Sequence, residues 1–343
     1  MGAGVKPLER SDPVRLGSIT LRGRLGSGGM GRVYYGLTDD YEPVALKVIR
    51  EDLAGRAEVR ARFARETDAL RTVQSPQVAA LIDASDEDAD QPWLAVEYVR
   101  GLNLKEYIDS RGPLDPQQAA TLGALLAGGL GDIHRAGLLH RDFKPGNVLL
   151  GRDGPKIIDL GLAALLDGSS DLTTTGAMLG TPACMAPEQA ANAKNVSPAC
   201  DVYALGATLL FALTGHYPFD AKTVPALLVR IADPDVAPDL SGLPQQFHEP
   251  LSRMLAHAPH DRPTIAQVYQ QLKTMATADG TAFPIAARRL ATATYVERDD
   301  DPQDVTPPPR PTRRDAPRPL EPGSVVARLA DRLRTEYAVD APF

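Results

Sequence analysis

The chain has 343 residues and is mildly acidic, with 37 lysines and arginines against 44 aspartates and glutamates and a net charge of −7. Hydrophobic residues make up 43% and charged residues 24% of the chain, which is typical of globular proteins and excludes a fibrous or wholly disordered one. The negative charge argues against nucleic acid or an anionic membrane as the main partner, because both attract clustered positive charge.

Cysteine content and apolar stretches bear on the cellular location. Cys184 and Cys200 are too few for a disulfide framework or a four-cysteine zinc site, so we expect free thiols. Residues 1–17 lack the apolar core of a secretion signal. The longest apolar stretch, residues 202–214, is shorter than the roughly 20 residues that cross a bilayer. These features predict a cytoplasmic protein with no membrane span.

The order of predicted elements indicates an α+β fold of two lobes. Strands dominate the first part and helices the second, which places them in separate layers. The predicted parts are an N-terminal arm (1–15), a β-rich lobe (16–98), a helical lobe (99–275) and a C-terminal tail (276–343). Residues 299–322 are acidic and then rich in proline and arginine, so we expect a disordered, low-complexity tail. A short amphipathic helix, 324–338, is expected to end it.

A glycine-rich segment lies between two strand-like stretches near the N-terminus. Gly26, Gly28 and Gly31 form the pattern G-x-G-x-x-G, and such glycines let backbone N–H groups approach phosphate oxygens. Residues 33–37 then alternate like a strand, whereas a dinucleotide-binding fold would begin a helix there. We predict a glycine hairpin that covers a nucleotide; an ordinary flexible turn is the alternative.

A lysine and a glutamate are candidates for a buried ion pair. Lys47 lies within the apolar strand 43–49, where a charge is costly unless an anion meets it. The helix expected at 56–73 has Glu66 in the middle of its apolar stripe, and a buried carboxylate needs a cation. We expect Lys47 and Glu66 to pair; a surface lysine and a rim glutamate, both facing water, are the alternatives.

Residues 139–161 are the most informative segment. Two short apolar strands joined by a tight turn bring Asn147 and Asp159 to the same end of a hairpin. Their oxygens suit a hard cation such as Mg²⁺. Asp142 and Lys144 lie on the loop that leads in, and together the four residues have the composition of a phosphoryl-transfer site. For any single aspartate or asparagine, turn capping is the alternative.

These motifs occur in the order of the protein-kinase signature set. They are the glycine loop, Val44-Ala45-Leu46-Lys47, His140-Arg141-Asp142 with Asn147, Asp159-Leu160-Gly161 and Ala186-Pro187-Glu188. With Gly-Gly-Met-Gly in the loop, residues 16–275 resemble a bacterial eukaryotic-like serine/threonine protein kinase. The resemblance implies the bilobal kinase fold and transfer of the γ-phosphoryl group of Mg-ATP to serine or threonine hydroxyls of protein substrates.

The resemblance also implies a role for each matched residue. Asp142 would accept the proton of the substrate hydroxyl, and Lys144 would neutralise the transferred phosphoryl group. Lys47, paired with Glu66, would hold the α- and β-phosphates. The predicted ligands of Mg²⁺, or of Mn²⁺, are Asn147 and Asp159. The predicted contacts of ATP are Leu25, Gly26, Gly28, Gly31, Val33, Ala45, Lys47, Glu97, Val99 and Leu149.

Substrate class and regulation rest on the same resemblance. Lys144 and Thr181 match serine/threonine rather than tyrosine kinases. Thr173 and Thr175 resemble the phosphorylated pair of bacterial relatives, so we expect autophosphorylation there, and a phosphothreonine would pair with Arg141. An unmodified polar loop is the alternative.

Further matched positions are expected to support the fold. Asp201 would tie down the catalytic loop, a role compatible with capping the helix that follows, and Arg262 would clamp Glu188. A hydrophobic spine would join the lobes through Leu70, Leu81, His140 and Leu160. Leu160 and Cys184 depart from the family, since an aromatic residue is usual at both positions, and Cys184 is a candidate exposed thiol near the site.

Alternatives remain for the function as a whole. A pseudokinase or nucleotide-binding scaffold would recruit partners through its tail, and a small-molecule kinase would share the fold. The complete catalytic set disfavours the first. The long activation segment that the resemblance implies, residues 159–188, disfavours the second. A transient homodimer and a tail-binding partner are further expectations.

Overall fold

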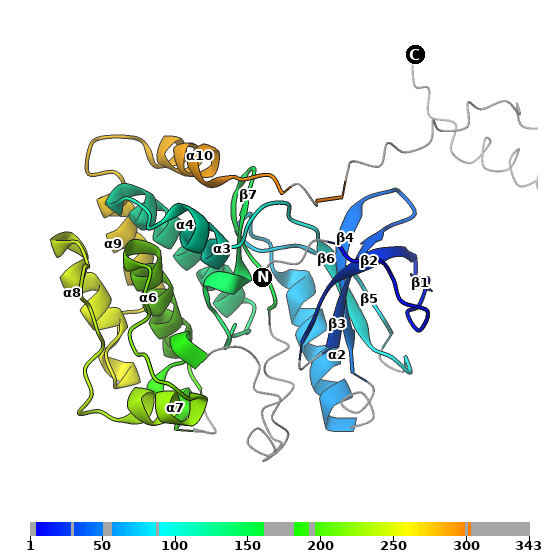
Figure 1. Cartoon of the computed structure of the whole chain (residues 1–343), viewed down its shortest axis with the longest axis horizontal. Helices are drawn as coiled ribbons and strands as arrows, with labels where there is room; N and C mark the ends of the chain where they lie inside the picture. Colours follow the sequence, from blue (N-terminus) through cyan, green and yellow to red (C-terminus); the bar gives the residue numbers. More distant parts are fainter. Residues whose placement is uncertain are drawn as a thin grey trace, which may run out of the picture. The chain divides into compact units, whose positions relative to one another are not determined.

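A computed structural model describes residues 5–28, 31–50, 57–86, 89–160, 182–191, 196–298 and 301–302. These residues form a sheet-rich lobe followed by a helical lobe (Figure 1), as the sequence predicts. The predicted positions Thr173, Thr175 and Thr181, and the predicted helix 324–338, lie outside the described residues.

The N-terminal lobe is built on an antiparallel sheet with the strand order β1-β2-β3-β4-β6-β5. The strands are β1 (Arg15–Leu16), β2 (Ile19–Gly28), β3 (Gly31–Leu37), β4 (Pro43–Ile49), β5 (Leu81–Ala84) and β6 (Trp93–Glu97). Because side chains alternate along a strand, the cross-strand neighbours Tyr34 and Leu46 are buried on one face. On the other face, helix α2 (Ala57–Thr72) packs Phe63 against Ile49 and Leu94.

The N-terminal arm is bound to this sheet from residue 5 onward. Lys6 and Arg24 exchange two backbone hydrogen bonds, of 2.8 and 2.7 Å. The buried Asp12 carboxylate accepts hydrogen bonds of 2.6 Å from both Arg24 Nε and Arg24 Nη2, and one of 2.8 Å from the Tyr34 hydroxyl. The arm therefore contributes a buried ionic cluster to the lobe.

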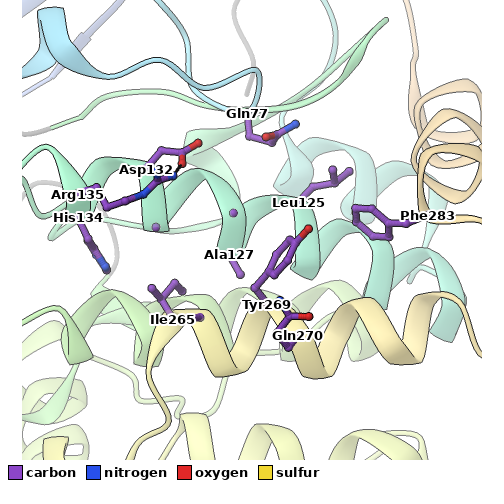
Figure 2. A pocket seen from close by; sticks show the side chains of 13 residues that line it. Gln77, Leu125, Ala127, Asp132, His134, Arg135, Ile265, Tyr269, Gln270 and Phe283 are labelled. Carbon is purple, nitrogen blue, oxygen red and sulfur yellow. Dashed lines mark hydrogen bonds and ion pairs between the residues drawn. The ribbon is translucent and has the colours of Figure 1, made fainter.

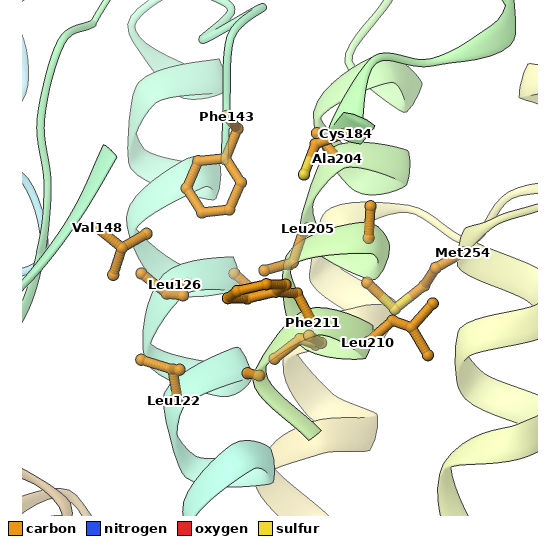
Figure 3. Close-up of a cluster of buried hydrophobic side chains, with 14 of the residues drawn as sticks. Leu122, Leu126, Phe143, Val148, Cys184, Ala204, Leu205, Leu210, Phe211 and Met254 are labelled. Atoms are coloured by element: carbon orange, nitrogen blue, oxygen red, sulfur yellow. The ribbon is translucent and has the colours of Figure 1, made fainter. Parts of the chain in front are cut away.

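The helical lobe surrounds one large apolar core (Figure 3). Its helices are α3 (Leu104–Arg111), α4 (Pro116–Arg135), α5 (Pro187–Ala190), α6 (Ala199–Thr214), α7 (Val224–Ala232), α8 (Gln245–Met254), α9 (Ile265–Ala276) and α10 (Phe283–Thr294), with short 3-10 turns η1 (Pro145–Asn147), η3 (Pro182–Cys184) and η4 (Pro259–Asp261). Helix α6 is buried on every side, because residues 200–213 are apolar almost throughout. Helix α4 starts sharply, since Asp115 caps it and Pro116 fits its first turn.

A two-stranded hairpin lies where the lobes meet. It consists of β7 (Val148–Gly151) and β8 (Gly154–Ile157), which pair antiparallel with Val148 opposite Ile157. Ile157 also bridges to Val78, on the segment that leads into β5. The hairpin thus connects the helical core to the sheet-rich lobe.

The region expected to be a low-complexity tail from residue 276 contains an ordered helix, which corrects that prediction. Helix α10 buries Ala286, Leu290 and Ala291, and it packs against α4, β7 and β8. These apolar residues recur at helical spacing, so they supply the packing that the overall composition of the region conceals.

The helical lobe also has a surface hollow of about 700 Å³ between α4 and α9, beside α10. Ala127, Ile265, Tyr269 and Phe283 line it (Figure 2). None of the residues predicted for the active site belongs to its lining. Among the described residues, no helix has the length and apolarity that crossing a membrane requires.

Candidate active site

The glycine segment forms the end of the β2–β3 hairpin, as predicted. Gly28 lies opposite Gly31, and Gly26 lies opposite Val33. A Cβ on Gly31 would lie 1.8 Å from the carbonyl oxygen of Val48, so only glycine fits there. A Cβ on Gly26 would meet nothing within 4 Å. The hairpin therefore packs closely on β4 at Gly31 and leaves open space at Gly26. A loop that covers a phosphate chain requires such space beside its backbone.

A strip of partly exposed apolar side chains follows the inner face of the sheet. Val33 lies opposite Lys47, and Ala45 lies opposite Val96, so strand register places these four side chains on one face. All four are only partly buried, whereas the alternate residues, such as Leu46, are fully buried. This strip is where the resemblance predicts contacts with the adenine ring, and Leu25, Val99 and Leu149 are partly buried as well.

Lys47 reaches the helical lobe. Its Nζ lies 3.0 Å from Asp159 Oδ1, with the lysine side chain 12% and the aspartate side chain 43% exposed. Within the described residues no ion pair joins Lys47 to Glu66, so the predicted pair is not formed in this structure. Helical spacing does place Glu66 on the inner face of α2, but it does not fix the distance to β4, and Asp159 provides the anion instead.

The charge of Lys47 also acts on the acidity of Asp159. Burial favours the protonated carboxyl, but the nearby Lys47, which also donates a hydrogen bond, outweighs it and lowers the pKa of Asp159 below its usual value. Asp159 is therefore a carboxylate at neutral pH. Its backbone φ is 61°, a left-handed conformation that few residues other than glycine adopt.

Asp142, Lys144 and Asn147 converge on the loop before β7. Lys144 Nζ lies 2.6 Å from Asp142 Oδ2. Asn147 Nδ2 donates to the backbone oxygen of Asp142 at 2.8 Å and to its Oδ2 at 3.3 Å. The N–H of Ile158 donates to the carbonyl of Asn147 at 3.0 Å, which places Asp159 directly beside this loop. The predicted hairpin geometry is thus present.

A buried carboxylate holds the start of this loop. Asp201, in the first turn of α6, accepts backbone hydrogen bonds of 2.9 Å from His140 and from Arg141. His134 Nε2 lies 2.8 Å from the same carboxylate. Burial opposes ionisation of Asp201, but the bond from His134 and the proximity of His140 lower its pKa. Arg141 has a left-handed backbone, with φ of 63°, and this tether holds it there.

Glu188 and Arg262 form a bidentate ion pair in the helical lobe. Arg262 Nη1 and Nη2 lie 2.7 Å from the two carboxylate oxygens of Glu188. The guanidinium group also donates to the carbonyls of Ala199, Ala256 and His257, and its side chain is fully buried. This pair anchors the end of the segment that begins at Asp159.

The comparison with known families decides what this arrangement is. Residues 19–272 match the protein kinase domain. The chain belongs to the protein kinase family.

Two bacterial relatives resemble this kinase domain over most of its length. The chain is 44% identical over 275 residues to the probable serine/threonine-protein kinase PkwA of Thermomonospora curvata, covering 80% of this chain and 36% of that protein. It is 40% identical to the serine/threonine-protein kinase AfsK of Streptomyces griseus over 98% of this chain and 42% of that protein. The chain thus spans well under half the length of these relatives. The resemblance to bacterial serine/threonine kinases is confirmed.

A solved structure supports the fold. The kinase domain of PknI from Mycobacterium tuberculosis superposes with a TM-score of 0.60 at 28% identity, and the match covers 76% of this chain and 96% of that one. The kinase fold predicted from the motifs, with its sheet-rich and helical lobes, is therefore confirmed.

The residues present suit ATP with a divalent cation, the combination that membership of the kinase family implies. Asp159 is ionised. Asn147 donates hydrogen bonds from Nδ2 to Asp142, so the amide oxygen of Asn147 is the atom of this side chain that can bind a cation. The described residues contain no group of three or more histidines, cysteines or acidic residues that could hold a metal ion. A site with so few protein ligands suits a cation that also binds substrate phosphates.

Other predicted and unpredicted residues complete the kinase site. Of the predicted spine residues, Leu70 and Leu160 lie in the main core, Leu81 packs against it and His140 is buried; that they form a spine joining the lobes stays a prediction. Cys184 is buried, and burial raises the pKa of its thiol to about 12, which corrects the expectation of an exposed thiol. Two further contacts of the site are not predicted by the sequence. His134 Nε2 lies beside the Asp201 carboxylate, and Gln189 Nε2 donates to the Arg141 carbonyl at 2.9 Å. Neither residue has a local sequence signal.

Proposed function

We propose that this chain is an ATP-dependent protein serine/threonine kinase. The observation that carries the proposal is the convergence of one carboxylate, Asp142, with Lys144 and Asn147 on a loop that also adjoins Asp159 and Lys47. Two carboxylates, two cations and an amide in one place suit phosphoryl transfer, in which positioning and electrostatics do most of the work.

Asp142 is the residue to which the substrate hydroxyl would donate. Lys144 and Asn147 both bind its Oδ2, so the carboxylate is fixed in orientation while Oδ1 remains to accept a hydroxyl proton. Lys144, 25% exposed, is placed to offset negative charge beside Asp142. This lysine, two residues after Asp142, also supports serine or threonine as the acceptor.

The nucleotide side of the site consists of Lys47, Asp159, Asn147 and the glycine hairpin. Mg-ATP supplies the phosphoryl group that is transferred. Asp159 and Asn147 would hold the Mg²⁺, and Lys47 would turn from Asp159 to the α- and β-phosphates, since a lysine amine is a mobile point charge. The strip of Val33, Ala45, Val96, Val99 and Leu149 would cover the adenine.

Regulation and surroundings belong to the same proposal. Thr173 and Thr175 are proposed as autophosphorylation sites, and Arg141 as the partner of a phosphothreonine. Proteins with serine or threonine are the proposed substrates. Free, buried thiols at Cys184 and Cys200 suit a reducing compartment and support a cytoplasmic location.

Transfer from radiolabelled ATP to a mixture of serine, threonine and tyrosine peptides tests the proposal. We expect label on serine and threonine in the presence of Mg²⁺, none on tyrosine, and none after chelation. Mass spectrometry of the protein itself should find phosphate at Thr173 or Thr175. Nucleotide binding without any transfer would instead identify a pseudokinase scaffold, and label on tyrosine would refute the assigned acceptor class.

A further inference from the structure

The described residues that follow α10 lie along the hinge between the lobes, residues 97–101. After α10 come residues 295–298 and 301–302, which we call the hinge strap. Tyr295 lies under the guanidinium group of Arg152, 5.6 Å from the ring centre, and near Gly101, where a Cβ would be 3.6 Å from its ring. In Figure 1 this part of the chain, in orange, passes from α10 beside β7 towards the sheet-rich lobe.

Two polar contacts fasten the hinge strap. The Tyr98 hydroxyl donates to Asp301 Oδ1 at 2.8 Å. Arg298 Nη1 donates to Glu106 Oε2, on α3, at 3.0 Å, and these two side chains are only 17% and 19% exposed. The N–H of Asp301 donates to the carbonyl of Arg298 at 3.1 Å. This bond joins the two anchoring residues of the strap, Arg298 and Asp301, to each other.

Tyr98, which binds the strap, also contacts two strands of the sheet-rich lobe. Its ring meets the edge of the Tyr35 ring on β3, with the ring centres 5.0 Å apart, and its N–H donates to the carbonyl of Pro43 at 3.3 Å. Burial and the bond to Asp301 raise the pKa of its hydroxyl, so Tyr98 remains a donor at neutral pH. Through Tyr98 the strap holds β3 and β4, and through Glu106 it holds the helical lobe.

The neighbouring hinge residue is held separately. Glu97 Oε2 lies 2.7 Å from Lys156 Nζ on β8. Successive side chains of an extended chain point to opposite sides, so Glu97 binds the hairpin while Tyr98 binds the strap. The backbone at Glu97 and Val99, where adenine contacts are predicted, is thus fixed from both sides.

We propose that Asp301 and Arg298 are positioning residues for nucleotide binding, because they join Tyr98 to Glu106 and hold the hinge backbone in one conformation. This inference rests on the proposed function. Neither residue is placed to touch ATP. Their effect is preorganisation: a hinge that is already ordered loses less conformational entropy when the nucleotide binds. Loss of the strap should therefore weaken ATP binding and leave the transfer step, which depends on the loop held by Asp201, nearly unchanged.

Calorimetry of nucleotide binding and steady-state kinetics on the full chain test this inference. Asp301→Ala should raise Kd and KM for ATP about three- to tenfold, the range that corresponds to the net contribution of a typical intramolecular hydrogen bond, with kcat within about twofold. Tyr98→Phe keeps the ring and removes the hydroxyl, so it should have the same effect. The double variant should be no worse than either single one, because both remove the same bond.

Matched variants distinguish a specific role of Asp301 in positioning the hinge from a general effect of removing a carboxylate. Asp235→Ala removes an exposed carboxylate of the helical lobe and should change neither Kd nor KM for ATP. Asp301→Glu keeps a carboxylate and should bind ATP more tightly than Asp301→Ala. Amide hydrogen exchange at residues 98–100 should be faster in Asp301→Ala than in the parent chain.

The possible outcomes distinguish this inference from the proposed function. An unchanged Kd in Asp301→Ala, or additive losses in the double variant, would overturn the positioning role. Nucleotide binding that depends on the strap, in a protein that never transfers phosphate, would overturn the proposed function alone. Equal falls in kcat and affinity, with a lower melting temperature, would show that the strap only stabilises the fold.

Discussion

Arg262 shows how one buried side chain anchors Glu188 and the start of α5. Its guanidinium group satisfies both oxygens of Glu188 and three backbone carbonyls, and it lies 5.0 Å from the centre of the Tyr203 ring. A buried pair of this kind is costly to break, because the remaining charge loses its partner in an apolar environment.

Replacement of Arg262 should therefore destabilise the kinase domain strongly. Arg262→Leu is expected to lower the free energy of unfolding by about 3–5 kcal/mol, measured by urea titration. Arg253→Leu is the control, since its pair with Glu249 is exposed on both sides and should cost less than about 1 kcal/mol. The double variant Arg262→Leu/Glu188→Leu should regain part of the loss; a double variant as unstable as the sum of both single ones would contradict the pair's role.

The residues around Asp142 also mark how far sequence reasoning extends. Short-range spacing predicts that Asn147 and Asp159 meet at one end of a hairpin, because a tight turn fixes that geometry locally. The partner of Lys47 depends instead on the distance between α2, β4 and the helical lobe. No local pattern encodes that distance, and so Asp159 rather than Glu66 pairs with Lys47 in the structure.

At the scale of elements, the N-terminal arm braces the strands on both sides of the glycine hairpin. Asp12 joins the arm to Arg24 on β2 and to Tyr34 on β3. The sequence predicts an arm over residues 1–15, separate from the β-rich lobe that begins at residue 16. What attaches the arm is one buried carboxylate, and its partners lie 12 and 22 residues away in the chain.

The Asp12 cluster should make the stability of the N-terminal lobe depend on pH. The hydrogen bond from Arg24, despite burial, lowers the pKa of Asp12 from 3.8 to about 2. The ionised carboxylate therefore stabilises the folded state above pH 3.8, and this contribution is lost as the pH falls through about 2.

Thermal unfolding as a function of pH measures this contribution. Asp12→Asn should lower the melting temperature at pH 7, and the gap to the parent chain should narrow as the solution is acidified towards pH 3. Asp39→Asn, which removes an exposed pair with Arg15, should show almost no gap. A gap for Asp12→Asn that stays constant or grows on acidification would show that the carboxylate charge is not what stabilises the arm.

Helix α10 should contribute to stability through its buried face. Leu290 is 1% exposed and belongs to the main core, so Leu290→Ala should cost about 2–5 kcal/mol of unfolding free energy. Ile285 lies on the same helix but is 52% exposed, and Ile285→Ala should change stability by less than about 0.5 kcal/mol. Similar effects of the two substitutions in urea titrations would mean that α10 does not pack as described.

The same helix shows where the sequence-based description of the region after residue 275 differs from the structure. The motifs end near Arg262, and a change of composition follows, so everything after residue 275 was assigned to a tail. Leu290 and its neighbours nevertheless recur at helical spacing. A window restricted to residues 283–294 would have predicted an amphipathic helix, whereas the charge and proline content of the wider region conceals it.

At the scale of the whole molecule, the site is assembled from both lobes. Lys47 and the glycine hairpin come from the sheet-rich lobe. Asp142 and Asn147 come from the loop before the β7–β8 hairpin, and Asp159 comes directly after it. Hydrogen bonds at the hinge, at Glu97 and at Tyr98, hold these halves together. The fold, the order of the motifs and the catalytic loop were predictable from local patterns; the hinge contacts, which join residues up to 203 positions apart, were not.

The most direct test of the catalytic assignment compares transfer with binding in the full chain and in Asp142→Asn. Asparagine keeps the shape of the side chain but accepts protons poorly, so kcat should fall about 10²- to 10⁴-fold, while the Kd for Mg-ATP measured by calorimetry stays within about twofold. Asp153→Asn, in the exposed turn of the neighbouring hairpin, should leave both quantities unchanged. An Asp142→Asn variant that transfers phosphate at the rate of the parent chain would contradict the assignment of Asp142 as the residue that accepts the substrate proton.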